Sequence, residues 1–441
     1  MEYRKGARLS EGKTKIVWKV KDRAEKVIIE NKNDITAFDD PSFTKQFKTK
    51  AAYATMVTCR VFELLEKAGV PVAYEQQIAD NQFVASNCSM IPLEVVARRF
   101  AVGSFLKRHP ELVTDEGIVP KRFHGVAVEF FLKTTKGKLV NHKGETVLSG
   151  LDPKKGEEDP LIVNPFEKDW RLFHPKKPNW EETADLGRTL KTSKILPSRS
   201  SEMMREMEVL MRKTFLVLEG AWNTLGYRLI DMKIEFGVDK KGKLMVADVI
   251  DNDSWRLRDA KWQELSKEAF RQGEKLDEVE KKYGFVADLA QRFILPQQAI
   301  VLWRGSDSDD FPDMSFLGSS QGIVVEEVTL SGHKSTQKCL KKLGDIMTRF
   351  PEGGVIIACV GMSNGLGPIL AARTGWPVIG VPMTAEKFPE DVWSSLRVPS
   401  QVPMATVLSG KNAVLLACNI LAQKNPVAYA IRQMSIEALD A

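Results

Sequence analysis

Apolar and polar side chains alternate between residues 229 and 238, as in a β-strand that buries one of its two faces. A second strand-like run follows at 244–253, so the two segments are predicted to form a hairpin. With 240–243 as a four-residue loop, Glu235 would lie opposite Asp248, with Cβ atoms about 5 Å apart. Two carboxylates that close are tolerated when one is protonated or a cation lies between them, and Mg²⁺ prefers oxygen ligands. Glu235 and Asp248 are therefore candidate metal ligands, although an ordinary amphipathic hairpin with a solvated polar face explains the pattern equally well.

The rest of the first half mixes helix and strand patterns. Apolar residues recur every three or four positions between 50 and 68, and Gly69 and Pro71 end that predicted helix. Further elements are predicted as strands at 16–20, 26–30 and 91–100 and as a helix at 202–223.

Two segments of the first half have a different composition. Glycine, proline and lysine punctuate residues 133–200, which predicts a long surface insertion, either a lid or an elaboration. A charged helical pattern at 273–293 predicts a linker.

From residue 298 the pattern changes to short, wholly apolar strands that alternate with helices. The strands 299–303, 323–330 and 355–360 each lead into a Gly/Ser-rich loop that opens a helix. This pattern predicts a doubly wound parallel sheet with three polar loops at one edge, where ligands bind and helix N-termini suit a phosphate. His333 and Asp309 are the evident proton carriers among these loops. A lone histidine is often structural, but His333 lies in a loop rather than on an apolar face, which favours a functional role.

Two basic motifs are candidate anion sites. Gly12 with Lys13 and Lys15 is close to a P-loop, but position 7 is Ala and a strand follows instead of a helix. The motif can still hold phosphates through backbone N–H groups and charge, or it can be an exposed basic turn. The second motif combines a strand that ends in arginines with a Gly-Ser turn, and the alternative is a solvated basic face. Its cationic residues are Arg98, Arg99, Lys107 and Arg108, and its turn contains Ser104.

The composition is that of an ordinary soluble protein. With 441 residues, of which 43% are hydrophobic and 28% charged, the chain is expected to form two or three domains. The net charge of +6 is small and dispersed, which favours anionic small substrates over nucleic acid. Five widely spaced cysteines without a CxxC motif argue against disulfides or zinc and favour a reducing compartment. No membrane-length apolar run or apolar leader is present, so we expect a cytosolic protein with no membrane partner.

Together these motifs resemble those of the bifunctional phosphoribosylaminoimidazole carboxylase/phosphoribosylaminoimidazole succinocarboxamide synthetases, the fused animal enzymes of purine synthesis. The resemblance covers nearly the whole chain, and the segments around Glu235 and Asp248 match most specifically. It implies an ATP-grasp-like synthetase domain with antiparallel sheets at 1–262, a helical linker at 263–297 and a Rossmann-like carboxylase domain at 298–441. The matching segments are 11–15, 103–108, 231–237, 247–256, 305–309, 333–334, 363–368 and 391–397.

In the synthetase reaction that the resemblance implies, ATP phosphorylates a carboxylate of the nucleotide substrate, and the amine of L-aspartate displaces the phosphate. Glu235 and Asp248 would hold Mg²⁺. The implied ATP ligands are Gly12, Lys13, Lys15 and Lys233, and the implied ligands of anionic substrates are Arg98, Ser104, Lys107 and Arg108.

In the implied carboxylase reaction, C4 of aminoimidazole ribonucleotide attacks CO₂ without biotin or ATP, and the ring proton is then lost. The resemblance also suggests a homo-octamer built by the C-terminal domains. The implied catalytic residues are His333, Asp309 and Lys334, and Ser306, Ser308, Ser363 and Asn364 would hold the substrate's phosphate and carboxylate.

The chain departs from the family pattern at a few positions. Gly332 stands where the family has Ala, and Met362 where it has Arg. Losing a charge that meets a buried anion costs on the order of 2–5 kcal/mol. In the first half, Thr49 and Thr55 replace Gly and Asn. One alternative is thus a synthetase whose impaired carboxylase domain is an oligomerisation scaffold, and another is a non-catalytic nucleotide- or RNA-binding protein with a basic insertion.

Overall fold

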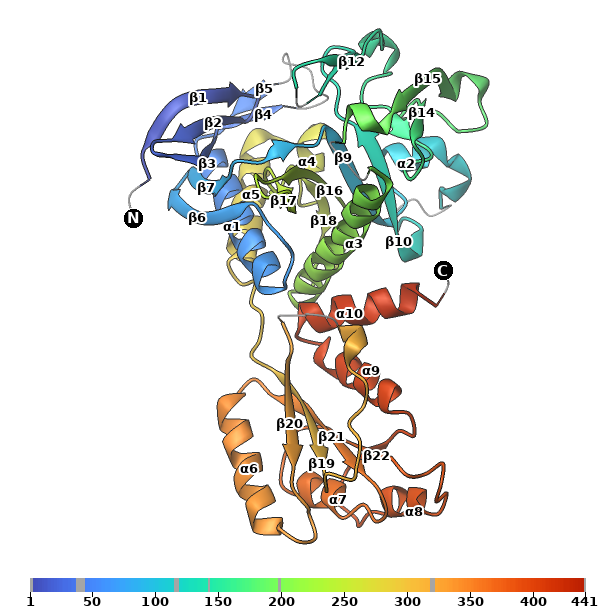
Figure 1. Ribbon diagram of the computed structural model, residues 1–441. Coiled ribbons are helices and arrows are strands. Elements are labelled where there is room, and N and C mark those ends of the chain that lie inside the picture. The colour runs from blue at the N-terminus through green and yellow to red at the C-terminus, as the bar shows by residue number, and fades with distance from the viewer. Residues whose placement is uncertain are drawn as a thin grey trace. The chain divides into compact units, whose positions relative to one another are not determined.

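The computed structural model describes residues 3–36, 44–114, 119–141, 143–196, 200–317 and 322–439. The chain divides into two compact units (Figure 1). The first unit is Met1–Glu66 with Val70–Phe293, and the second is Ile294–Ala441 with Lys67–Gly69. Within the described ranges, no helix is both long enough and apolar enough to cross a membrane.

Antiparallel strands form a five-stranded sheet in the first unit, in the order β1-β2-β3-β7-β6. The Gly12 N–H donates to the Lys15 carbonyl at 2.9 Å, so the motif that resembles a P-loop is the turn of the β1-β2 hairpin. The strands are β1 (Lys5–Glu11), β2 (Lys15–Val20), β3 (Arg23–Asn31), β6 (Tyr74–Ala79) and β7 (Gln82–Ser86).

A nine-stranded antiparallel sheet carries most of the candidate residues of this unit. Its main path is β15-β14-β13-β10-β9-β16-β17, and β8 and β18 also pair with β16. The strands are β8 (Ser89–Met90), β9 (Leu93–Phe100), β10 (Arg122–Leu132), β13 (Leu161–Ile162), β14 (Asp169–Phe173), β15 (Asp185–Lys191), β16 (Arg228–Val238), β17 (Leu244–Ala247) and β18 (Trp255–Arg258). Two small hairpins pair β4 (Asp34–Thr36) with β5 (Thr44–Gln46) and β11 (Leu139–Val140) with β12 (Thr146–Leu148).

The β16-β17 hairpin forms as predicted, but the predicted register is wrong. Glu235 pairs with Ala247, not with Asp248. The reason lies in the loop, where the Asp239 carboxylate accepts hydrogen bonds from the N–H groups of Lys241 and Lys243 at 2.8 and 2.9 Å. The Asp239 N–H also donates to the Lys243 carbonyl at 3.0 Å, so the loop is one residue shorter than predicted and the pairing shifts by one residue.

In the part of the first unit that the structure describes, there are five α-helices. The predicted helix at 50–68 is α1, and the one at 202–223 is α3, which packs on β9 and β16. In the segment predicted to be a linker, α5 buries Val279 and Tyr283 against Ile35 and Phe47, so this helix belongs to the core of the first unit. The helices are α1 (Lys50–Lys67), α2 (Ser104–Arg108), α3 (Ser200–Thr224), α4 (Glu268–Arg271) and α5 (Leu276–Ala290).

The insertion at 133–200 is more ordered than a surface loop. Its strands β13, β14 and β15 extend the nine-stranded sheet beyond β10. Trp170, Leu172 and Leu190 are buried there, so the segment has a small apolar core of its own.

The second unit is the predicted parallel sheet, with strand order β20-β19-β21-β22-β23. Helices α6 and α7 contribute to the core on one face, and α9 packs against β21; α6 and α9 lie on opposite sides of the sheet in Figure 1. The elements are β19 (Ala299–Arg304), β20 (Val324–Thr329), α6 (Thr336–Arg349), β21 (Gly354–Val360), α7 (Leu366–Ala371), β22 (Val378–Pro382), α8 (Asp391–Leu396), β23 (Ala405–Thr406), α9 (Gly410–Leu421) and α10 (Pro426–Glu437).

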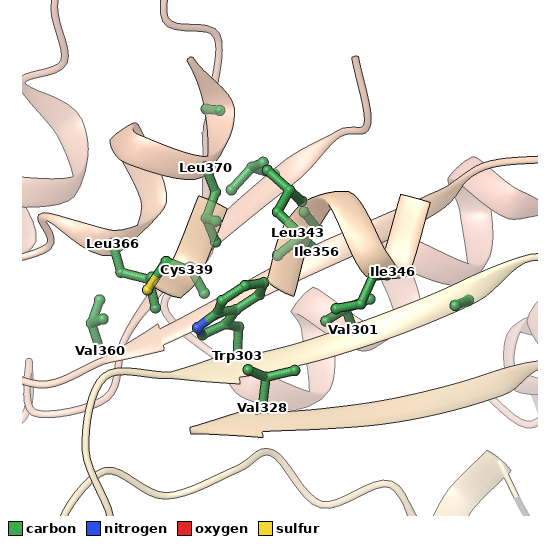
Figure 2. Packing of buried hydrophobic residues seen from close by; sticks show 14 of the residues in the cluster. Val301, Trp303, Val328, Cys339, Leu343, Ile346, Ile356, Val360, Leu366 and Leu370 are labelled. Atoms are coloured by element: carbon green, nitrogen blue, oxygen red, sulfur yellow. The ribbon is translucent and has the colours of Figure 1, made fainter. Parts of the chain in front are cut away.

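Trp303 lies at the centre of this core (Figure 2). Its ring packs among side chains of β19, β20, β21, α6 and α7, including Cys339, Leu343 and Leu366. The indole N–H donates to the Leu330 carbonyl at 3.1 Å, which satisfies the one polar atom of this buried side chain. The packing around Trp303 and its bond to Leu330 thereby hold the carboxyl ends of β19, β20 and β21 in place.

Candidate functional site

Two lysines and two carboxylates meet at one end of the β16-β17 hairpin. Lys15 at the start of β2 bonds the carboxylate of Asp248, and Lys133 just after β10 bonds that of Glu235. The backbone of Asp248 is left-handed, with φ 68°, so the chain leaves β17 at this residue. Three parts of the chain that are remote in sequence, the start of β2, the end of β10 and the β16-β17 hairpin, therefore supply one charged cluster, Lys15–Lys133–Glu235–Asp248.

The charges in this cluster influence one another. Burial lowers the pKa of Lys15 to about 8, and the neighbouring Glu235 carboxylate acts in the opposite direction. Burial would raise the pKa of Glu235, but the charges of Lys133 and Lys15 outweigh it and leave that pKa lowered. At neutral pH the carboxylate is thus ionised and Lys15 is mostly protonated, whereas above about pH 8 the lysine would gain a proton if a polyanion approached.

The donor chemistry of Glu235 and Asp248 fits Mg²⁺. This ion usually takes one or two protein carboxylates and completes its shell with water and the phosphate oxygens of a nucleotide. Across the described ranges, no group of three or more His, Cys, Asp or Glu side chains is arranged as a metal site. Two carboxylates beside lysines match a site that is completed by a phosphorylated ligand.

The other predicted nucleotide ligands lie on exposed surfaces. Lys13 is exposed in the β1-β2 turn next to Gly12. Lys233 on β16 is half exposed and bonds Glu94 at 2.8 Å.

Asp159, after β12, is a partly buried carboxyl group of the same unit. It accepts a 2.7 Å bond from the Thr134 N–H, and burial raises its pKa to about 6 despite that bond.

The arginine motif forms a buried ion-pair network. Arg98 donates to Glu129 at 2.8 Å, to Asp231 at 2.5 Å and to the Ser104 hydroxyl at 3.2 Å. Arg256 donates to the same oxygen of Asp231 at 2.6 Å. The predicted residues Arg98 and Ser104 therefore lie together, on a carboxylate frame that the sequence pattern did not indicate.

Arg108 and Lys107 occupy opposite environments. Arg108 is fully buried, bonds Glu129 and donates to the Pro175 carbonyl at 2.5 Å. Lys107 is exposed on the same short helix. Arg108 thus holds Glu129 from the interior, whereas Lys107 is open to a ligand.

A second carboxylate cluster follows the hairpin and was missed by sequence reasoning. The Asp253 carboxylate lies 3.3 Å from the ammonium of Lys50 and 3.2 Å from that of Lys267, and it accepts a bond from Tyr283. Burial would raise the pKa of Asp253, but the charges of Lys50 and Lys267 leave it lowered; burial and Asp253 together raise the pKa of Asp251. The isolated Lys50 at a helix start gave no signal of this pairing, because its partners come from distant segments.

In the second unit, the three predicted loops converge at the carboxyl edge of the sheet. The Asp309 carboxylate lies so close to the backbone of Gly361 that an added Cβ there would be 2.7 Å from it. The His333 ring lies against Gly365 in the same way, at 2.0 Å from such an added Cβ. Because Gly361 and Gly365 have no side chains, both predicted proton carriers can pack against the loop after β21, at the same edge of the sheet.

The same loops also carry hydroxyl groups. Ser306 and Ser308 share a hydrogen bond of 2.5 Å and are exposed, as are Ser363, His333 and Lys334. The exposed groups provide hydroxyl, imidazole and ammonium groups for an anionic ligand.

Asn364 is instead buried, and it has a clear structural task. Its side chain donates to Ser395 at 3.0 Å and accepts from the Gly367 N–H at 2.8 Å, and its own N–H donates to Ser394 at 2.9 Å. These bonds tie the loop after β21 to α8.

The two units match two enzyme families. The SAICAR synthetase family profile matches residues 8–153 and 180–288, and the AIR carboxylase profile matches residues 299–437. The chain is 34% identical to probable multifunctional protein ADE2 of Caenorhabditis elegans, over 96% of this chain and 91% of that protein. It is 33% identical to the bifunctional phosphoribosylaminoimidazole carboxylase/phosphoribosylaminoimidazole succinocarboxamide synthetase of Rattus norvegicus, over 96% and 92%.

The chain belongs to this bifunctional carboxylase/synthetase family. It is an enzyme with a ligase unit and a lyase unit, as the resemblance predicted. The solved phosphoribosylaminoimidazole-succinocarboxamide synthase of Ehrlichia chaffeensis covers 65% of this chain and 99% of its own, with 22% identity and a TM-score of 0.47.

The departures from the family pattern have different structural settings in the carboxylase unit. Gly332 is buried, and a Cβ there would lie 2.8 Å from the Cα of Leu366, so α7 packs where the family's alanine methyl would be. Met362 is 76% exposed beside Ser363. In the synthetase unit, Thr55 accepts a 2.7 Å bond from Asn31, and Thr49 bonds Glu280 at 2.5 Å, so both threonines are accommodated.

Proposed function

We propose that this bifunctional enzyme carboxylates aminoimidazole ribonucleotide with CO₂ and then joins the product to L-aspartate with the use of ATP, giving the succinocarboxamide ribonucleotide. Residues 298–441 would carry the first step and residues 1–262 the second, with 263–297 between them. The observation that carries the ligase half is the cluster of Lys15, Lys133, Glu235 and Asp248, which combines carboxylate oxygens for Mg²⁺ with ammonium groups for phosphates.

In the ligase step, the chain holds a triphosphate next to a carboxylate. Lys13, Lys15 and Lys233, with the backbone of Gly12, bind the phosphates of ATP. Mg²⁺ held by Glu235 and Asp248 would offset the charge that develops during phosphoryl transfer. The lowered pKa of Glu235 supports this role, because the carboxylate stays ionised at neutral pH.

The anionic substrates bind at the arginine motif. Arg98 and Ser104, fixed by Glu129 and Asp231, present donors in a set geometry, and Lys107 adds an exposed charge. Arg108 contributes indirectly, because its guanidinium bonds Glu129, the carboxylate that fixes Arg98. Such a fixed frame orients the carboxylate for phosphorylation and the aspartate amine for attack.

In the carboxylase step, C4 of the substrate attacks CO₂, and the ring proton then leaves. His333 takes this proton, with Asp309 and Lys334 nearby. The convergence of His333 and Asp309 against Gly365 and Gly361 supports this assignment. The substrate's phosphate and carboxylate are held by Ser306, Ser308 and Ser363, with Asn364 positioning the loop. Biotin and ATP take no part.

We propose a cytosolic homo-octamer assembled through the carboxylase units. The support is a set of large apolar side chains that are exposed on this unit, since such side chains are typical of subunit interfaces. Nucleic acid is not a partner in this proposal. The exposed side chains are Met362, Phe388, Trp393, Leu396 and Leu408.

A paired-substrate assay tests the function. Purified protein receives ATP, Mg²⁺ and L-aspartate with either aminoimidazole ribonucleotide plus bicarbonate or the carboxylated intermediate, and product is measured by mass spectrometry. We expect succinocarboxamide product from both. Product from the intermediate alone would leave a synthetase with a scaffold domain, and no product from either would reject the proposal.

A further inference from the structure

Residues 154–179 lie between the two ranges that the synthetase family profile matches, 8–153 and 180–288. The segment contains β13 and β14 and extends the sheet from β10, where Phe130 pairs with Ile162 and Phe131 with Leu161. Glu129, which bonds Arg98, precedes these paired residues on the same strand. The segment is therefore built onto β10, the strand whose Glu129 bonds Arg98.

The segment also contacts the arginine motif directly. The Pro175 carbonyl accepts a 2.5 Å hydrogen bond from Arg108, whose other terminal nitrogen bonds Glu129. Arg108 is fully buried, and within the described residues its Nε has no hydrogen-bond partner. A buried charge with few partners depends strongly on each one, so the Pro175 carbonyl is important for keeping the guanidinium in place.

The contact continues toward the substrate side through shared carboxylate oxygens. Glu129 receives Arg108 on Oε1 and Arg98 on Oε2, the latter at 2.8 Å. Arg98 then reaches Ser104 at 3.2 Å. A displacement of Pro175 would thus be transmitted through Arg108 and Glu129 to Arg98.

His174 fixes the turn that carries this carbonyl. Its Nδ1 accepts a 3.1 Å bond from the Lys176 N–H, so its Nε2, 3.0 Å from the Lys155 carbonyl, is the protonated nitrogen. The ring is buried, and Gly156 lies next to it; a Cβ on Gly156, where φ is 74°, would be 3.4 Å from Nε2. The imidazole therefore joins the residue after Pro175 to the Lys155 backbone at the start of the segment.

We propose that residues 154–179 are a positioning element of the ligase site, in which His174 fixes the Pro175 carbonyl that holds Arg108, Glu129 and Arg98 in register for the ribonucleotide. His174 is a positioning residue, since it acts through other groups. This inference rests on the proposed role of Arg98 in binding the substrate.

The test compares His174→Ala, His174→Gln and Gly156→Ala with wild type, supplied with the carboxylated intermediate, ATP, Mg²⁺ and L-aspartate. His174→Ala removes both ring bonds, and we expect KM for the ribonucleotide to rise about tenfold while KM for ATP stays within about twofold. His174→Gln can keep the bond to Lys155 and should recover part of the loss. Gly156→Ala keeps the imidazole but strains its neighbour, so a smaller rise is expected.

Arg171→Ala is the matched control. Arg171 lies in the same segment, and its guanidinium pairs with Asp185 at 2.8 Å, so the variant removes a charge from the segment without touching His174. Its kinetic constants should equal those of wild type. Thermal unfolding and carboxylase activity are measured for every variant, and Gly156→Ala decides the case if His174→Ala fails to fold. An unchanged ribonucleotide KM in a folded variant, or an equal rise in both KM values, would overturn the inference. A wild-type enzyme without ligase activity would instead reject the proposed function.

Discussion

Lys15 donates a hydrogen bond to the carboxylate of Asp248, although the two residues are 233 positions apart in the sequence. The bond joins the β1-β2 turn to the end of the β16-β17 hairpin. Because Lys133 bonds the neighbouring Glu235, the two ammonium groups nearly balance the charge of the two carboxylates. A triphosphate with Mg²⁺ would exchange these internal ion pairs for contacts with the ligand.

Replacing Lys15 by Met is expected to abolish most ligase activity and to spare the carboxylase. A fixed donor to a transferring phosphoryl group typically contributes a factor of about 10²–10³ to kcat. Each activity is measured separately with its own substrate. Lys19→Ala, which removes an exposed lysine from the same strand, is the control and should be nearly silent. Equal loss of both activities would point to misfolding rather than to phosphate binding.

ATP binding should be accompanied by proton uptake at mildly alkaline pH. Burial lowers the pKa of Lys15 to about 8, so above this pH the free enzyme has a largely neutral amine. A polyanion raises that pKa, and protons are then taken up between about pH 8 and pH 10. Calorimetric titrations with Mg-ATP in buffers of different ionisation enthalpy measure this uptake. Lys15→Arg should bind without it; the same uptake in both proteins would rule out Lys15 as its source.

Asp159→Asn should stabilise the protein at neutral pH. Burial raises the pKa of Asp159 to about 6, while the unfolded value is about 3.9. A raised carboxyl pKa favours the fold fully below the unfolded value, and this contribution is lost as pH rises through about 6. Asn keeps an acceptor for Thr134 and tolerates the φ of 51°. We expect a gain on the order of 1–2 kcal/mol at pH 7 and almost none at pH 4, measured by urea unfolding. A gain independent of pH would contradict this explanation.

Glu219→Ala should be among the most destabilising single changes in the synthetase unit. Arg99 is fully buried and holds the Glu219 carboxylate with two bonds of 2.7 and 2.9 Å, which join β9 to α3. Removing one partner of a buried pair typically costs about 3–5 kcal/mol, because it leaves the other charge uncompensated. The control is Glu208→Ala on the same helix, which breaks a partly exposed pair with Arg212 and should cost less than about 1 kcal/mol. Similar urea midpoints for the two variants would refute the distinction.

Gly332→Ala should impair the carboxylase, although alanine is the residue of the family pattern. The new methyl group would lie 2.8 Å from the Cα of Leu366, so the start of α7 must shift, next to His333. Gly344→Ala is the control within α6, where an added Cβ meets nothing within 4 Å. That change is expected to stabilise the unit by about 0.5–1 kcal/mol through helix propensity. Full carboxylase activity of Gly332→Ala would mean that α7 adjusts without cost.

The sequence alone determined the local elements and the kind of chemistry. Alternation at 229–238 predicted β16, the helical spacing at 50–68 predicted α1, and the apolar strands after 298 predicted a parallel sheet with His333 and Asp309 at one edge. These features are readable because the period of side chains along an element is a local property. The family resemblance then supplied the two activities that the comparisons bear out.

Tertiary structure alone decided which charges meet. The hairpin register depended on the side chain of Asp239, and the partners of Lys15, Lys50 and Arg108 come from distant segments. Ion pairs and hydrogen bonds to backbone carbonyls leave no periodic trace in a sequence, because their partners are selected by how strands pair across the fold. Thus the sequence determines which residue types are available for the sites, whereas the tertiary structure determines which carboxylate each cation contacts.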